Sequence, residues 1–68
     1  SEYKQLVLAG LQQLSEDKRT AVVLRDLKGF SYEEVADMTN TPLGTVKSRL
    51  NAARRELRDF LQAKGVQL

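Results

Sequence analysis

The chain has 68 residues, of which 41% are hydrophobic and 29% are charged, and its formal net charge is +2. These values fit one small globular domain over residues 1–68, with a thin core. Because the chain contains neither cysteine nor histidine, it has no disulfide, no thiolate metal ligand and no imidazole base. The composition therefore counts against an enzyme, a metal centre and a bound cofactor.

No apolar run approaches the roughly 20 residues that a bilayer-spanning helix needs. Residues 1–4 also lack the apolar stretch of a signal peptide. We therefore expect a soluble, cytoplasmic protein with no membrane contact and no small-molecule substrate. The chain begins without methionine and in charged helical sequence, so we expect a fragment of a longer protein.

The predicted elements are all helices, because alternation of apolar and polar residues never persists along the chain. The first helix is expected over residues 3–14, with Leu8, Leu11 and Leu14 on one side. The sequence thus predicts an all-α fold that begins with an amphipathic helix.

A second helix is expected over residues 16–28. Ser15 is a good N-cap for it, because a serine hydroxyl accepts from the free backbone N–H groups of the first turn. Gly29 is expected to end this helix in a left-handed conformation. The side chains expected to point inward are Ala21, Val22, Leu24 and Leu27.

A third, short helix is expected over residues 32–39. Ser31 and Glu34 have the serine-x-x-glutamate spacing of a capping box, in which each side chain binds the backbone N–H of the other residue. Asn40 suits a left-handed turn after this helix. The spacing therefore predicts a short helix followed by a tight turn.

The fourth helix is expected over residues 42–61. Thr41 is the expected cap, and Pro42 fits the first helical position, where its missing N–H is not needed. Gly65 is expected to leave the end of the helix frayed. This is the longest predicted element, and it follows the tight turn directly.

The fourth helix sorts its residues by polarity. With Val46 as the reference and about 100° per residue, its apolar side chains fall within about 60° of one direction. They are Leu43, Leu50, Ala53, Leu57, Phe60 and Leu61. A polar, mainly cationic face lies between about 100° and 200°, and it comprises Gly44, Lys47, Ser48, Asn51, Arg55 and Arg58. Such sorting predicts a face that meets a polyanion.

Many basic helical faces are merely solvated, but three features favour binding here. A short helix, a tight turn and a longer basic helix match a helix-turn-helix, whose second helix enters the DNA major groove. Gly44 and Ser48 allow close backbone approach, and the hydroxyls of Thr41, Thr45 and Ser48 lie where phosphates dock. The candidate DNA-binding residues are Thr41, Gly44, Thr45, Lys47, Ser48, Arg49, Asn51, Arg54, Arg55 and Arg58.

The motifs "GFSYEEVA" and "TPLGTVKSRL", together with the upstream "VVLRDLK", resemble region 4 of the extracytoplasmic-function (group 4) sigma-70 factors of bacterial RNA polymerase. This resemblance implies a domain that recognises the promoter −35 element within a holoenzyme. It also implies docking on the flap of the polymerase β subunit and masking by an anti-sigma factor. Relatives often carry an aromatic residue or histidine and then arginine after "SRL", where this chain has Asn51 and Ala52, so the base preference stays open.

Two other functions compete with this one. Response-regulator output domains of the LuxR type also have four helices and a "TVK" at the start of the recognition helix. A module that only binds a protein partner, such as an anti-sigma factor, is the other alternative. For protein binding, we expect an apolar groove between the first and third helices, near Val7, Leu8 and Leu11, that accepts a partner helix.

Overall fold

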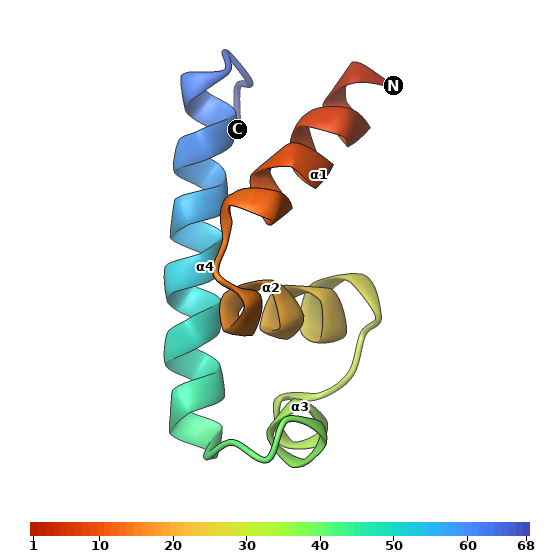
Figure 1. Ribbon diagram of the computed structural model, residues 1–68, viewed down its shortest axis with the longest axis vertical. Coiled ribbons are helices and arrows are strands. Elements are labelled where there is room, and N and C mark those ends of the chain that lie inside the picture. Colours follow the sequence, from red (N-terminus) through yellow and green to blue (C-terminus); the bar gives the residue numbers. More distant parts are fainter.

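The computed structural model describes all 68 residues. Its helices are α1 (Glu2–Gln13), α2 (Glu16–Val22), the π-helical η1 (Val23–Leu27), α3 (Tyr32–Met38) and α4 (Leu43–Ala63). The long helix α4 runs the length of the molecule, and α1, α2 and α3 lie along one side of it (Figure 1). None of the helices has both the length and the apolar character needed to cross a membrane. The all-helical prediction is confirmed, with helix ends within two residues of those expected.

The turn between α1 and α2 is built from local capping. Leu14 is extended, and the Ser15 side chain accepts from Lys18 N as the predicted N-cap. Arg19 also links the two helices by hydrogen bonds: its Nε donates to Leu11 O at 2.9 Å and its Nη2 donates to Leu14 O at 3.0 Å. The last carbonyls of α1 thus receive partners from α2, which fixes the angle between the two helices.

The helix expected over residues 16–28 changes geometry halfway. Its second part, η1, is π-helical, and Lys28 N donates to Val23 O at 2.9 Å. Gly29 then ends it with φ 81°, as predicted. A π-helical turn holds more residues than an α-helical turn, so the positions after Val23 face new directions. Leu27, expected inside, is therefore 61% exposed.

The predicted capping box begins α3: Glu34 N donates to Ser31 Oγ, and Ser31 N donates to Glu34 Oε1. Asn40 follows the helix with φ 50°. Around it, Thr41 N donates to Ala36 O and Asn40 N to Asp37 O, which is the Schellman pattern. The left-handed turn predicted at Asn40 is confirmed, and it leads the chain straight into α4.

The predicted start of α4 is wrong by one residue. Pro42 is the N-cap and Thr41 makes no capping bond, because the Thr41 hydroxyl donates to Thr39 O and accepts from Arg49 instead. The end also differs, because α4 reaches Ala63. Gly65 adopts φ 89° and Val66 N donates to Leu61 O at 3.0 Å, so a second Schellman turn replaces the frayed end.

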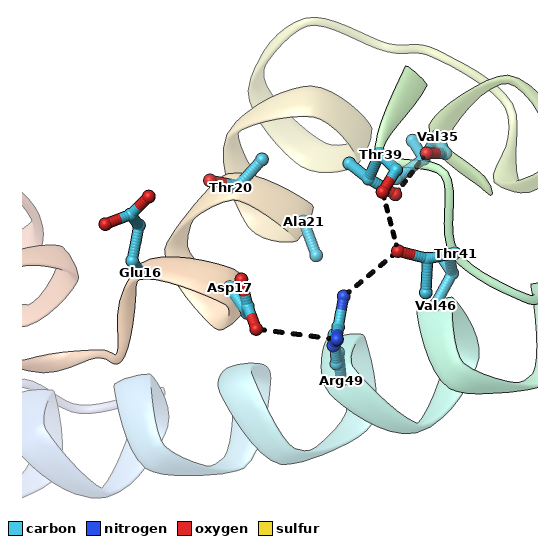
Figure 2. A pocket seen from close by; sticks show the side chains of 9 residues that line it. All are labelled: Glu16, Asp17, Thr20, Ala21, Val35, Thr39, Thr41, Val46 and Arg49. Atoms are coloured by element: carbon cyan, nitrogen blue, oxygen red, sulfur yellow. Dashed lines mark hydrogen bonds and ion pairs between the residues drawn. The ribbon is translucent and has the colours of Figure 1, made fainter. Parts of the chain in front are cut away.

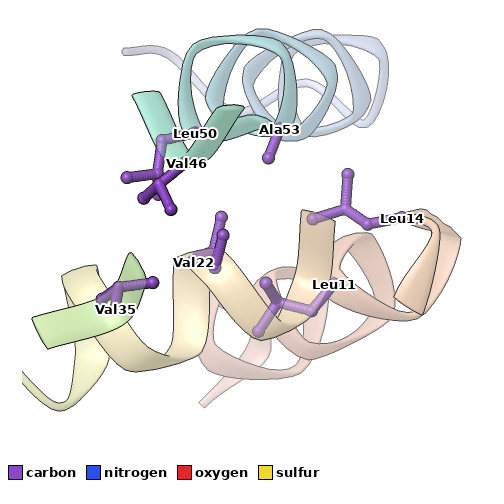
Figure 3. Packing of buried hydrophobic residues seen from close by; sticks show 8 residues of the cluster. Leu11, Leu14, Val22, Val35, Val46, Leu50 and Ala53 are labelled. Carbon is purple, nitrogen blue, oxygen red and sulfur yellow. The ribbon is translucent and has the colours of Figure 1, made fainter. Parts of the chain in front are cut away.

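The core lies where α1, α2 and α3 meet α4. In Figure 3, buried side chains of α4 point toward those of the other helices. The buried cluster comprises Leu11, Leu14, Ala21, Val22, Val35, Val46, Leu50 and Ala53. Phe30 and Leu57 pack against its edge. One small core thus fixes one face of α4 and leaves the other face to solvent.

Candidate nucleic-acid interface

The two faces predicted for α4 are confirmed by burial. Val46, Leu50, Ala53 and Leu61 are buried on one side, with Leu43, Leu57 and Phe60 half-buried beside them. The residues predicted for the opposite face are all exposed, and they are Gly44, Lys47, Ser48, Asn51, Arg55 and Arg58. The tight turn after α3 places the first turns of this face at one end of the molecule (Figure 1).

The basic residues of the exposed face have no acidic partners. Lys47, Arg55 and Arg58 take part in none of the ion pairs of the chain. Their charges are therefore directed to solvent and are not neutralised by the protein. An unpaired cationic face next to a helix N-terminus attracts phosphate groups.

Thr41 and Arg49 belong to an internal network instead (Figure 2). Arg49 lies 3.4 Å from Asp17 Oδ2 and donates to Thr41 Oγ1 at 3.3 Å. Thr41 in turn donates to Thr39 O at 2.9 Å. These groups surround a polar cavity of about 300 Å³ between α2, the turn and α4. The network ties the turn to the start of α2.

Arg54 is also engaged within the domain. Its Nε and Nη2 donate to the two carboxylate oxygens of Asp26 at 2.9 Å and 2.6 Å. These hydrogen bonds are the main reason why the pKa of Arg54 is raised. Hydrogen bonding from Arg54, followed by that from Arg25, lowers the pKa of Tyr32. Arg25 lies over the Tyr32 ring, 4.8 Å from its centroid.

The hydroxyl residues near the start of α4 differ in availability. Thr45 is half-buried, whereas Ser48 is exposed and its Oγ donates to Thr45 O at 3.0 Å. This bond uses the hydroxyl proton, so the oxygen lone pairs remain free to accept from an outside donor. Ser48 is therefore the hydroxyl of this helix that is best placed to meet a base or a bound water.

Nothing local in the sequence identifies Asp17 and Asp26 as partners of α4. Each lies on the helix segment formed by α2 and η1, and Asp26 is separated from Arg54 by 28 positions. Capping and dipole effects already account for an acidic residue such as Asp17 in a first helical turn. Only the packing of the second helix segment across α4 brings these carboxylates to the arginines.

The predicted Val7, Leu8 and Leu11 do line an apolar groove, but its other wall is not the predicted third helix. The groove is a hollow of about 300 Å³ between α1 and the end of η1, and α3 contributes nothing to its lining. Its lining residues are Tyr3, Lys4, Val7, Leu8, Leu11 and Leu27. The π-helical turn explains the difference, because it brings Leu27 out of the core and beside the first helix.

Comparisons with a family model and with individual known proteins point to the same family. Residues 4–57 match the family model described as "Sigma-70, region 4". The chain is 40% identical over 62 residues to the ECF RNA polymerase sigma-E factor of Haemophilus influenzae, covering 91% of this chain and 33% of that protein. It is 43% identical over 61 residues to the sigma-E factors of Escherichia coli K12 and Salmonella typhimurium LT2, covering 90% of this chain and 32% of each.

The chain thus spans about a third of the length of the curated relatives that it matches. The match includes α2, η1, α3 and most of α4, so it contains the tight turn and the exposed basic face. On this evidence the chain belongs to the sigma-70 region 4 family.

Proposed function

We propose that this domain recognises the promoter −35 element as part of an RNA polymerase sigma factor in the bacterial cytoplasm. The observation that carries the proposal is the exposed face of α4, where Lys47, Arg55 and Arg58 have no acidic partner within the chain. The relatives described above are RNA polymerase sigma factors, which supports the proposal.

The residues of this face have different roles according to their distance from the start of the helix. The N-terminal part of a recognition helix contacts base edges. Lys47, Ser48 and Asn51 lie in that part, and Asn51 has the amide needed for a bidentate pair with adenine. Arg55 and Arg58 lie one to two turns further on and bind phosphates.

The experiment uses a holoenzyme assembled with Escherichia coli sigma-E factor in which this chain replaces the matching third. Binding is measured on a library of −35 sequences. The expected result is a defined sequence preference, which Asn51→Ala relaxes at one position by about 1 to 3 kcal/mol. Gln62→Ala is the matched control, because Gln62 is an exposed amide on the same side of α4 near its far end. Equal binding to every −35 sequence would contradict the proposal.

We further propose that the groove between α1 and η1 receives a helix of the polymerase β flap, and that an anti-sigma factor competes for it. The exposed apolar side chains that support this are Leu8 at 52% and Leu27 at 61% exposure. Amphipathic helices dock in grooves of this kind. Leu8→Glu is expected to weaken binding of an isolated β-flap fragment, while Gln12→Glu, outside the groove on the same helix, is the control. Unchanged binding by both variants would rule the groove out.

A further inference from the structure

All three ion pairs of the chain join the second helix segment to α4. Lys18 pairs with Glu56, Asp17 with Arg49, and Asp26 with Arg54. The side chains on α4 leave the helix on opposite flanks. Measured from Val46, Arg54 lies at about 80° on one side, whereas Arg49 and Glu56 lie at about 60° to 80° on the other side. The Arg54 flank therefore depends on a single ion pair.

That single pair has the geometry of an orienting contact. Both carboxylate oxygens of Asp26 accept from Arg54, at 2.9 Å and 2.6 Å. A planar fork that binds two oxygens fixes direction as well as distance, unlike an ammonium group. Beside this pair, Arg25 of η1 lies over the ring of Tyr32 in α3, 4.8 Å from its centroid. The cluster thus connects η1, α3 and α4 at one point.

We propose that the Asp26–Arg54 pair fixes the rotation of α4 about its own axis within the range that the core allows, and thereby the direction in which Lys47, Ser48 and Asn51 face DNA. In this role Arg54 is a positioning residue and makes no contact with DNA. This inference rests on the proposed function of the α4 face. It also changes the role expected for Arg54 from its place in the basic helix.

Small rotations are enough to matter at the DNA surface. Side-chain tips lie about 5 to 6 Å from the helix axis, so a rotation of about 20° displaces them by about 2 Å. A displacement of that size breaks a hydrogen bond to a base edge. Because Lys47 lies at nearly the same angle on α4 as Arg54, the direction fixed at Arg54 is also the direction of Lys47.

The pair is not expected to carry much of the folding stability. The side chains of Arg54 and Asp26 are 39% and 32% exposed, and exposed ion pairs contribute little to stability. Loss of the pair should therefore leave the melting temperature nearly unchanged while it alters recognition. This difference separates a positioning role from a merely structural one.

The test compares Asp26→Asn, Arg54→Lys and the double variant in the holoenzyme described above, on a −35 promoter and a scrambled −35 sequence. Each single variant is expected to reduce the discrimination between the two sequences by about two- to fivefold. The double variant should be no worse than either single variant, because both remove the same contact. The salt dependence of binding should stay unchanged.

Glu56→Gln is the matched control, because it removes one ion pair between the same two helix segments on the flank that keeps Asp17–Arg49. It is expected to retain the discrimination of the wild-type protein. If Arg54 instead contacts a phosphate, Asp26→Asn would strengthen DNA binding to every sequence, and Arg54→Lys would bind DNA as strongly as the wild type. Arg54→Gln would then reduce the slope of log affinity against log salt by about one. That result overturns the inference.

The two proposals fail in different ways. A wild-type holoenzyme that binds the −35 and scrambled promoters equally would refute the proposed function, and the inference with it. A wild-type holoenzyme that discriminates, together with variants at Asp26 and Arg54 that discriminate equally well, would refute the positioning role alone.

Discussion

Gly10 of α1 lies directly against Leu57 of α4. A Cβ atom on Gly10 would lie only 2.5 Å from Leu57 Cδ1, and 2.9 Å from Cδ1 of the neighbouring Phe60. The two helices therefore cross at a point where there is no room for a side chain. The place of α1 beside the long helix depends on this contact.

Gly10→Ala should destabilise the domain by about 1 kcal/mol. Overpacking at the helix crossing costs about 1 to 3 kcal/mol of stability. The higher helix propensity of alanine offsets about 1 kcal/mol of this cost. Urea unfolding of the chain measures the difference. A variant more stable than the wild type would mean that Leu57 and Phe60 move aside freely, and that the crossing is not tightly packed.

Gly44→Ala should have the opposite effect on stability. A Cβ at Gly44 meets no atom within 4 Å, so alanine gains helix propensity, up to about 1 kcal/mol, without a clash. If glycine is present to let DNA approach the backbone, the same variant binds the −35 element more weakly. Thermal melts test the expected gain in stability, and DNA-binding measurements on the same preparation test the expected loss of affinity. Undiminished DNA binding would leave the glycine without a functional reason.

Leu50→Ala should cost about 2 to 5 kcal/mol of unfolding free energy, because Leu50 is 1% exposed in the centre of the core. In so small a domain this loss is a large part of the total stability. Leu8→Ala is the comparison, since Leu8 is 52% exposed and should lose far less. A loss below about 0.5 kcal/mol at Leu50, the size usual for surface substitutions, would contradict the assigned core face of α4.

Arg55→Gln should weaken DNA binding of all sequences alike and reduce the slope of log affinity against log salt by about one, as expected for one lost phosphate contact. Lys64→Gln is a suitable control, because Lys64 is an exposed base at the C-cap of α4, outside both the predicted DNA face and the groove. The measurement is a titration of holoenzyme binding over a range of salt concentrations. Equal slopes for Arg55→Gln and wild type would remove Arg55 from the interface.

Tyr32 should titrate below the ordinary pKa of tyrosine, near 10, because Arg54 and then Arg25 hydrogen-bond to it and favour the phenolate. A folded-state pKa below the unfolded one contributes stability that is present above the unfolded pKa and is lost as pH falls through the folded pKa. This group should therefore make stability rise with pH only in the window just below pH 10.

The ultraviolet absorbance of a Tyr3→Phe chain reports Tyr32 alone, since the chain has two tyrosines. Adding Arg54→Gln should raise the midpoint of the titration. An unchanged midpoint would show that Arg54 does not reach the Tyr32 hydroxyl in solution.

The features that depend on neighbouring residues could be predicted from the amino-acid sequence. Ser15, the Ser31–Glu34 capping box and the left-handed Asn40 are all used as predicted, because caps and turns bond backbone groups within a few positions. The polar face of α4 also followed from helical periodicity, since its hydrophobic stripe has one side to bury. The family resemblance added the expected function of that face.

Which basic residues of α4 lack an acidic partner depends on how the helices pack in three dimensions. Arg49 and Arg54 look equivalent to Arg55 in a basic helix, yet each meets a carboxylate on the second helix segment. The π-helical turn that exposes Leu27 likewise has no signal in the local pattern. These outcomes depend on the angle at which helices cross and on atoms far apart in the chain, and local propensity contains no information about either.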